Sequence, residues 1–437
     1  MYAISILLVL FLPAKGFNVS TRRPPSIYLQ PEENVYYKQG ESVQLPCKAD
    51  GDPRPTYRWK KNGIHLNFGN IGVRFIQLPN EGTLVINAPE AKDEGIYQCI
   101  ADNDYGTSVS TKINFRMGKL DDFMAAFPVT HTPRLGESVV LNCIPPPSYP
   151  PASVQWVLVT PEGHVEPVNY DNRILMDLDG RLYITNIQEQ DKQGDKAYVC
   201  MATNYFMRRN TYDKANFIIP SGSTPVNRPV GYFWTSPSEQ VGIIGETLKL
   251  KCIFSGNPTP EVVWLKNNAT LPDTYEVSHG GHELTIANLT KDDAGQYECI
   301  GTNSLGHQIF RSFRSFVVRV ESKPDWEEEP KDVETSAGTS ATFICKANGF
   351  PEPNIAWFIN GIKLEESTVP IIQSGRFIKP DAYNITFVQL NNHDSLVLQC
   401  NASNVHGYLF ADVYLSVLEN RLGPMIVGYT EMTLHTK

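Results

Sequence analysis

The sequence predicts an all-β protein of four tandem β-sandwiches, because one pattern of cysteine, tryptophan and tyrosine recurs along its 437 residues. The eight cysteines form consecutive pairs roughly 50 residues apart, and a tryptophan follows the first cysteine of each pair by 12 or 13 residues. In three repeats a tyrosine stands two residues before the second cysteine. The pairs are Cys47 with Cys99, Cys143 with Cys200, Cys252 with Cys299 and Cys345 with Cys400; the tryptophans are Trp59, Trp156, Trp264 and Trp357.

This pattern is typical of immunoglobulin sandwiches, in which two antiparallel sheets pack face to face and one disulfide joins strand B to strand F. The tryptophan of strand C packs against that disulfide. A zinc site would need closely spaced Cys-x-x-Cys pairs, and the sequence has none. We therefore expect one disulfide per domain, each closing a loop of roughly 50 residues and stabilising its domain by about 2–4 kcal/mol.

Four alternating apolar and polar segments are expected to form strand E of the four domains. They are GTLVINA, GRLYITNI, HELTIANL and YNITFVQL, and each precedes the second cysteine of its repeat. Tyr97, Tyr198 and Tyr297 occupy the position of a tyrosine corner, in which the tyrosine hydroxyl donates a hydrogen bond to the backbone a few residues upstream. The fourth repeat has Leu398 there instead. We therefore expect the fourth domain to be the least rigid at this corner.

Three repeats carry an arginine 18 or 19 residues before an aspartate that closely precedes strand F. This spacing suits the ion pair that often closes the bottom of such sandwiches, and unpaired surface charge is the alternative. The third repeat has no such arginine. The pairs are Arg74 with Asp93, Arg173 with Asp191 and Arg376 with Asp394.

The N-terminal residues predict a secreted, extracellular protein. An apolar run from Ile4 to Leu12 precedes the small residues Ala14 and Gly16, which is typical of a signal peptide over residues 1–16. The segment lacks an initial Lys or Arg, and a buried N-terminal strand is the alternative. No later stretch approaches the roughly 20 apolar residues of a membrane span.

We expect immunoglobulin-like domains 1 to 4 at residues 24–117, 122–219, 232–320 and 324–418. Residues 220–231, PSGSTPVNRPVG, have the Gly, Ser and Pro content of a linker. The spacing predicts tight joints within the first and last pairs of domains and a loose joint between the pairs. A loose joint is compatible with an extended rod, or with a fold-back that places domain 1 on domain 4 and domain 2 on domain 3.

Segments from the whole chain resemble the first four immunoglobulin domains of the neuroglian-like neural cell-adhesion family. They are GTLVINAPEAKDEGIYQCIADNDYGTSVS with KLDDF, CIPPPSYPPASVQWV, DGRLYITNIQEQD and CNASNVHGYLFADVYLSV. The resemblance implies I-set sandwiches folded back as a horseshoe. It also implies adhesion or axon guidance through homophilic binding or binding to other immunoglobulin cell-surface proteins, with longer isoforms anchored in the plasma membrane.

Two questions stay open beside this resemblance. PEAKDEGIY is also similar in style to hemolin, a secreted insect immune protein, so recognition of a bacterial surface glycolipid is the alternative function. Residues 419–437 look like the start of a fifth domain, and we expect them to be poorly ordered because no partner sheet follows. A short isoform, an incomplete gene model and a secreted four-domain protein all fit this ending.

The sequence offers little support for catalysis or for nucleic-acid binding. Motifs such as H-E-x-x-H and G-x-S-x-G do not occur. His279 and His282, the one close histidine pair, lie in SHGGHEL, which favours a turn before strand E. The net charge of −9 gives no basic footprint for nucleic acid. We expect no enzyme, cofactor or metal.

Two kinds of surface site can still be named. Arg208 and Arg209 in NYFMRRN fall in the expected F–G turn of domain 2 and are candidate contacts to an acidic glycan or lipid phosphate. A solubilising turn is the alternative. Glycans would mark surfaces that the fold-back leaves free, and Asn401 should point away from its own core by strand alternation. The sequons start at Asn18, Asn268, Asn288, Asn384 and Asn401.

Overall fold

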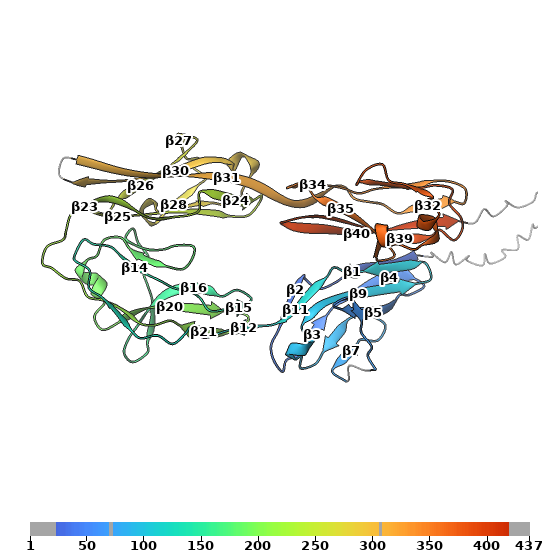
Figure 1. Cartoon of the computed structure of the whole chain (residues 1–437), viewed down its shortest axis with the longest axis horizontal. Helices are drawn as coiled ribbons and strands as arrows, with labels where there is room; N and C mark the ends of the chain where they lie inside the picture. The colour runs from blue at the N-terminus through green and yellow to red at the C-terminus, as the bar shows by residue number, and fades with distance from the viewer. Residues whose placement is uncertain (1–22, 70–72, 306–307, 419–437) are drawn as a thin grey trace, which may run out of the picture.

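The computed structural model describes residues 23–69, 73–305 and 308–418, excluding the side chains of residues 308–313. The chain forms four β-sandwiches in two layers, with domain 1 below domain 4 and domain 2 below domain 3 (Figure 1). It therefore folds back as a horseshoe, as the resemblance implied. The predicted signal peptide, Asn18 and the expected fragment at residues 419–437 lie outside the described residues.

Domain 1 has a larger sheet with the strand order β2-β11-β9-β5-β6, and β10 also pairs with β9. Its other face holds the β1-β4 pair and the β3-β8-β7 sheet. The elements are β1 (Arg23–Leu29), β2 (Asn34–Tyr37), β3 (Val43–Leu45), β4 (Lys48–Asp52), β5 (Thr56–Lys61), β6 (Ile64–His65), β7 (Phe75–Gln77), β8 (Leu84–Ile86), η1 (Ala91–Asp93), β9 (Gly95–Asn103), β10 (Gly106–Val109) and β11 (Ile113–Met117).

Domain 2 repeats this plan, with the sheet β13-β22-β20-β16-β17 facing the β12-β15 pair and the β14-β19-β18 sheet. Its elements are β12 (Lys119–Leu120), β13 (Val129–His131), β14 (Val139–Leu141), β15 (Ser148–Tyr149), β16 (Ser153–Val159), β17 (Val165–Pro167), β18 (Ile174–Met176), β19 (Leu182–Ile184), η2 (Glu189–Lys192), β20 (Ala197–Asn204), β21 (Arg209–Tyr212) and β22 (Asn216–Ile218).

Domain 3 pairs the sheet β24-β31-β30-β26-β27 with the sheet β23-β25-β29-β28. Its elements are β23 (Arg228–Thr235), β24 (Glu239–Ile243), β25 (Leu248–Asn257), β26 (Glu261–Lys266), β27 (Ala269–Thr270), β28 (Glu276–Ser278), η3 (His279–Gly281), β29 (Glu283–Ile286), η4 (Lys291–Asp293), β30 (Gly295–Leu305) and β31 (Gln308–Glu328).

Domain 4 places the sheet β32-β40-β39-β35-β36 against β33-β38-β37 and against β34, which pairs with the end of β31. Its elements are β32 (Val333–Ser336), β33 (Ala341–Ile344), β34 (Lys346–Phe350), β35 (Asn354–Ile359), β36 (Ile362–Lys363), η5 (Leu364–Glu366), α1 (Pro370–Gln373), β37 (Phe377–Ile378), β38 (Asn384–Phe387), β39 (Leu396–Asn404) and β40 (Gly407–Leu418).

Each domain has its own core around a disulfide and the strand C tryptophan. The structure contains the four cysteine pairs expected from their order, with Cα atoms 5.9 to 6.5 Å apart. The tryptophans are buried, and each indole N–H donates to a backbone carbonyl, which satisfies its polar atom inside the core. The acceptors are the carbonyls of Gly82, Gly180, Gly281 and Ala382.

The tyrosine corners form as the sequence predicts. The hydroxyls of Tyr97, Tyr198 and Tyr297 donate to the carbonyls of Asp93, Asp191 and Asp293 over 2.6, 3.2 and 2.7 Å. Leu398 is fully buried in domain 4 and makes no such bond, because it has no hydroxyl. The lower rigidity expected at that corner stays a prediction.

The three arginine–aspartate pairs also form, with N–O distances of 2.8, 3.0 and 2.7 Å in domains 1, 2 and 4. Domain 3 has a different arrangement at the same place. Lys266 Nζ lies 3.8 Å from Asp293 Oδ1, and the Tyr275 hydroxyl donates to that same carboxylate. A lysine and a tyrosine therefore replace the arginine where the sequence lacks one.

The joints between domains differ. Only Gly118 separates β11 of domain 1 from β12 of domain 2. The strand β31 runs unbroken from domain 3, where it pairs with β30, into domain 4, where it pairs with β34. In the segment expected as a linker, residues from Arg228 onward already belong to β23 and pair with β25.

Candidate functional site: the two fold-back interfaces

The first interface joins domains 2 and 3 through an apolar cluster that belongs to neither domain core. Leu175 on β18, Tyr183 on β19 and Ile253 on β25 are 4%, 3% and 1% exposed. The Tyr183 ring meets Phe233 edge-on, with centroids 4.9 Å apart. Because side chains alternate along a strand, Ile174 enters the core of domain 2 while Leu175 faces domain 3.

Polar contacts frame this cluster. Lys251 Nζ of domain 3 donates to the carbonyl of Met176 in domain 2 over 2.8 Å. The Asn186 amide donates to Asn257 Oδ1 over 3.1 Å, again across the interface. Lys251 Nζ also lies 2.9 Å from a carboxylate oxygen of Glu283. Burial opposes ionisation of Glu283, but hydrogen bonds from the ammonium groups of Lys249 and Lys251 hold its pKa below the usual value.

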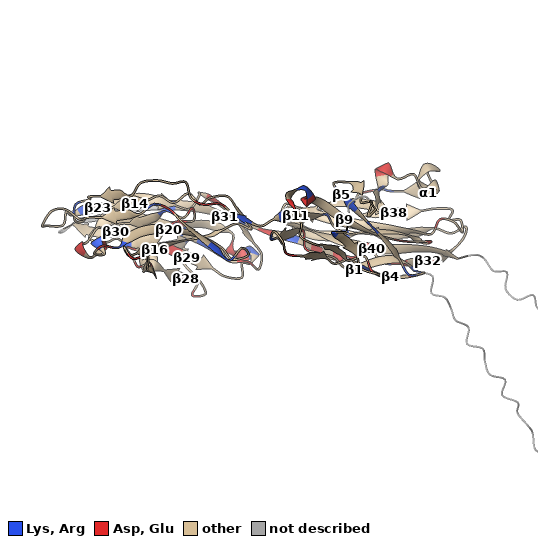
Figure 2. Ribbon diagram, turned by 90° about the horizontal axis from the view of Figure 1, so that it is seen from below, with Lys and Arg blue, Asp and Glu red and all other residues tan. Residues whose placement is uncertain are grey.

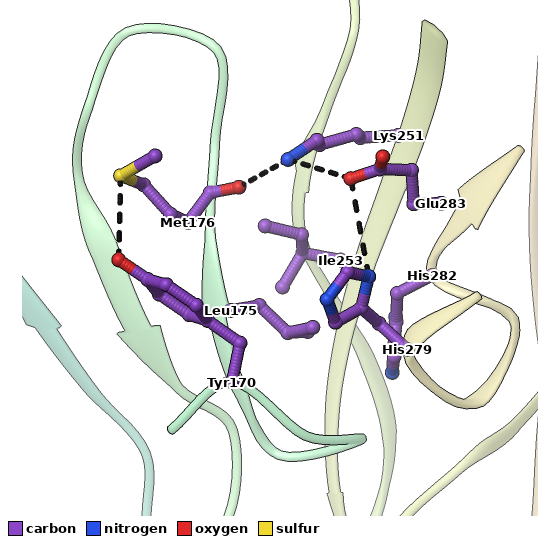
Figure 3. A pocket seen from close by; sticks show the side chains of 8 residues that line it. All are labelled: Tyr170, Leu175, Met176, Lys251, Ile253, His279, His282 and Glu283. Atoms are coloured by element: carbon purple, nitrogen blue, oxygen red, sulfur yellow. Dashed lines mark hydrogen bonds and ion pairs between the residues drawn. The ribbon is translucent and has the colours of Figure 1, made fainter. Parts of the chain in front are cut away.

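A cavity of about 80 Å³ lies between these groups, lined by residues of both domains (Figure 3). His282 forms part of its wall, and its Nδ1 lies 2.6 Å from the carbonyl of Cys252. Burial lowers the pKa of His282 to about 4, so the imidazole is neutral at pH 7. His279, in the predicted turn, lies 4.0 Å from Glu283. The cavity thus combines an apolar wall with one satisfied ion pair.

The second interface joins domains 1 and 4 around a half-buried aspartate. Asp412 on β40 accepts hydrogen bonds from the Ile27 amide over 3.2 Å and from Ser108 Oγ over 2.7 Å, both in domain 1. It also accepts from Gln399 Nε2 of its own domain over 2.8 Å, and that amide donates to the carbonyl of Val109 in domain 1 over 3.2 Å. Burial raises the pKa of Asp412.

The backbones approach closely beside this aspartate. A Cβ on Gly106 would lie 2.5 Å from a methyl of Val397 in domain 4, and the φ of Gly106 is +155°. A Cβ on Gly361 of domain 4 would lie 2.5 Å from a methyl of Val109, at a φ of +77°. Glycine therefore permits the contact from both sides, because a side chain would collide and the backbone favours glycine.

Of the expected anion-contact residues, Arg208 lies in the turn between β20 and β21, where the F–G turn was expected, and Arg209 is the first residue of β21. Arg209 donates to the carbonyl of Leu120 over 2.6 Å and pairs with Asp122 at 2.7 Å. Arg208 is exposed. The neighbouring Phe206 ring lies 5.3 Å from Lys38 Nζ of domain 1, so this turn contributes to the joint between domains 1 and 2.

The described sequon asparagines have different surroundings. Asn268 and Asn288 are exposed in turns of domain 3. Asn384 is half-buried, and its Nδ2 donates to Asp381 over 2.9 Å. Asn401 points away from its own core, as expected, but it shares the outer face of β39 with Gln399, which contacts domain 1. Its Oδ1 is enclosed without a hydrogen-bond partner.

A fourth repeated residue escaped the sequence analysis. An asparagine stands four residues after the second cysteine of each repeat, and its Nδ2 donates to two carbonyls on or next to a pair of neighbouring strands in the opposite sheet. One acceptor is the carbonyl of the proline in the B–C turn, and the other is the carbonyl at the start of the domain. The residues are Asn103, Asn204, Asn303 and Asn404. The constant spacing of four residues from the cysteine is the sequence pattern that could have identified these asparagines.

The charged residues that the structure describes form no candidate metal site. Acidic and basic residues are interspersed over both layers (Figure 2). Within the described ranges, no group of three or more His, Cys, Asp or Glu side chains could hold a metal ion. Nor does that part of the chain contain a helix long and apolar enough to cross a membrane. The candidate functional features are therefore the domain faces and the two interfaces that fix their arrangement.

Comparison with known families agrees with this architecture. The description "Immunoglobulin domain" matches residues 24–103, and "Immunoglobulin I-set domain" matches residues 232–312 and 324–417. These ranges together cover more than half of the chain, which therefore belongs to the immunoglobulin superfamily.

Within that superfamily the chain resembles neural adhesion proteins. It is 32% identical to neuroglian of Drosophila melanogaster over 432 residues, which are 95% of this chain and 32% of neuroglian. It is 31% identical to neurofascin of Gallus gallus over 424 residues, which are 91% of this chain and 30% of neurofascin. The chain thus spans about a third of the length of the curated relatives it matches.

A solved structure with the same arrangement is that of the insect immune protein hemolin. It superposes with a TM-score of 0.75 at 25% sequence identity, covering 91% of this chain and all of hemolin. The hemolin structure was described as a new domain arrangement with implications for homophilic adhesion. Both resemblances expected from the sequence are thereby confirmed.

Proposed function

We propose that this chain is the recognition region of an extracellular adhesion protein, which binds a second copy or another immunoglobulin protein through the faces of a closed horseshoe. The observation that carries the proposal is the pair of fold-back interfaces. These interfaces hold the four domains in one arrangement and leave the other faces of the domains available for binding. Similarity to neuroglian and neurofascin over more than nine-tenths of the chain supports adhesion. The four disulfides support an oxidising, extracellular location after removal of residues 1–16.

Bead aggregation tests this function. Beads are coated with residues 17–437 and mixed with and without bacterial lipopolysaccharide. Homophilic adhesion predicts that coated beads cluster without additive and that soluble chain inhibits the clustering. Beads that stay dispersed alone and cluster only with lipopolysaccharide would contradict adhesion and support hemolin-like recognition of a bacterial glycolipid instead.

A matched pair of leucines links the function to the horseshoe. Leu175→Asp places a charge in the interface between domains 2 and 3, whereas Leu178→Asp changes a leucine that is 51% exposed three residues away. The proposal predicts that L175D abolishes clustering and that L178D retains it. Clustering that survives L175D, with an opened shape confirmed in solution, would show that the closed arrangement is not the adhesive form.

A further inference from the structure

Asp412 is a half-buried aspartate that lies between two domains without a cation beside it. Among the described residues, no cationic side chain acts on its carboxylate, and every hydrogen-bond partner is a neutral group. A buried carboxylate normally has a counter-charge or takes up a proton, because burial in a low dielectric strongly disfavours an isolated charge.

Asp412 itself lines a cavity of about 250 Å³, and three other charged side chains line the same cavity. They are Arg23 on β1, Asp50 on β4 and Asp332 before β32, all of them exposed. Tyr414 on β40 is the other titratable group of that wall. The strands β10 and β39, which enclose the carboxylate, present neutral Ser108 and Gln399. Two acidic groups and one exposed arginine do not supply a buried counter-charge.

The hydrogen bonds around Ser108 indicate where a proton lies. Ser108 Oγ is 2.8 Å from the carbonyl of Pro25 and 2.7 Å from Asp412 Oδ2, yet a hydroxyl has only one hydrogen to donate. If Asp412 is ionised, Ser108 can donate to only one of these two oxygens, and the other oxygen lies at hydrogen-bond distance with no hydrogen between the atoms. With a protonated Asp412, Oδ2–H donates to Ser108, and Ser108 donates to Pro25. Both contacts are then satisfied, and Oδ1 still accepts from Gln399.

We propose that closure of the horseshoe takes up one proton at Asp412, so that the contact between domains 1 and 4 tightens as the pH falls. The proposal concerns the shape of the molecule and does not depend on its ligand. In the open form Asp412 is exposed and has an ordinary pKa near ~3.9. Burial raises this pKa in the closed form, which therefore binds the proton more tightly.

Linkage fixes the sign and the pH range. Below about pH 4 both forms are protonated, and the contact has its full stability. Between that pH and the raised pKa of the closed form, opening releases one proton, so the opening equilibrium rises up to tenfold per pH unit. Above the raised pKa both forms are ionised and the equilibrium is flat again.

The Ile27 amide provides the measurement, because it donates across the interface to Asp412. Hydrogen exchange of the whole chain is followed from pH 4.5 to 8 and divided by the intrinsic exchange rate to give a protection factor. The proposal predicts that the protection factor of Ile27 falls up to tenfold per pH unit in the wild type. D412N, which cannot titrate there, should show no such fall, and D273N, at an exposed aspartate of domain 3, should behave as the wild type.

A second variant covers the case in which D412N weakens the interface at every pH. Ser108→Ala removes the acceptor of the proposed proton in the closed form alone, so the fall in protection should still begin near pH 4 but level off at a lower pH than in the wild type. A wild-type protection factor that is independent of pH, or a slope that D412N retains in full, would overturn the proposal. His282, at the other interface, loosens domain 3 in acid and acts in the opposite direction, so it cannot imitate the predicted fall.

Discussion

Replacing Leu175 by alanine should open the horseshoe without unfolding domain 2. Leu175 is 4% exposed in the structure but lies outside the core of its own domain, so its burial depends on domain 3. The substitution removes three carbon atoms from the interface, worth about 2–2.5 kcal/mol at ~0.8 kcal/mol for each buried CH₂. The space left would adjoin the existing cavity of about 80 Å³, and poor refilling could raise the loss to about 4 kcal/mol.

This loss acts on the equilibrium between closed and open forms. At 1.4 kcal/mol for each factor of ten, about 2–4 kcal/mol corresponds to a roughly 30- to 700-fold rise in the opening constant. The assay is hydrogen exchange at the Gly256 amide, which donates across the interface to the carbonyl of Thr185. The calorimetric transition of domain 2 provides the control for its own fold.

Leu178→Ala is the matched variant, because Leu178 is 51% exposed and should change stability by no more than about 0.5 kcal/mol. If Leu175→Ala and Leu178→Ala change the exchange of Gly256 equally, Leu175 does not hold the two domains together. If Leu175→Ala instead lowers the transition of domain 2 by its full loss, the side chain belongs to the domain core and the interface argument fails.

Three further predictions concern single residues. Arg173→Met should lower the unfolding free energy of domain 2 by about 3–5 kcal/mol, because Asp191 is left buried without its cation. Calorimetry should show a smaller loss for Arg74→Met in domain 1, because the pair of Arg74 and Asp93 is more exposed. Equal losses in the two variants would contradict this reasoning. Asn404→Ala should cost domain 4 about 1–3 kcal/mol, because it removes two hydrogen bonds, to the carbonyls of Ser322 and Pro351, and it should speed hydrogen exchange at the joint to domain 3. Unchanged exchange there would refute the role of this asparagine. The unfolding free energy of domain 3 should be constant above about pH 6.5 and should fall by about 3 kcal/mol as the pH drops from about 6.5 to about 4. In this range the unfolded chain protonates His282, whereas burial in the folded domain keeps the imidazole neutral. His282→Gln should remove most of that fall in a urea titration series, and an unchanged fall would assign it to other groups.

The four domain cores were predictable because their chemistry is local to each repeat. A disulfide, a tryptophan and a strand E segment recur at nearly fixed spacing, and together they define one sandwich. The arginine–aspartate pairs follow from the same spacing. The substitute in domain 3 could not be found in this way, because Lys266 reaches Asp293 from strand C and not from the position of the missing arginine.

The interfaces could not be predicted from the residues alone. Gln399 and Asp412 alternate with core residues along β39 and β40, which is the pattern of a solvent-facing side chain. Only contact with domain 1, more than 280 positions earlier in the chain, covers them, so that Gln399 is buried and Asp412 is half-buried. Likewise His282 looked like part of a turn, because the sequence does not show that domain 2 covers it. The fold-back itself came from the resemblance to a family and not from the spacing of the domains.

Small-angle X-ray scattering of the whole chain at pH 5 to 7 tests the horseshoe most directly. The account predicts the compact two-layer profile calculated from the structure for the wild type and for Leu178→Asp, and a longer maximum dimension for Leu175→Asp. A wild-type profile of an extended rod of four domains would contradict the account, and so would a profile that Leu175→Asp leaves unchanged.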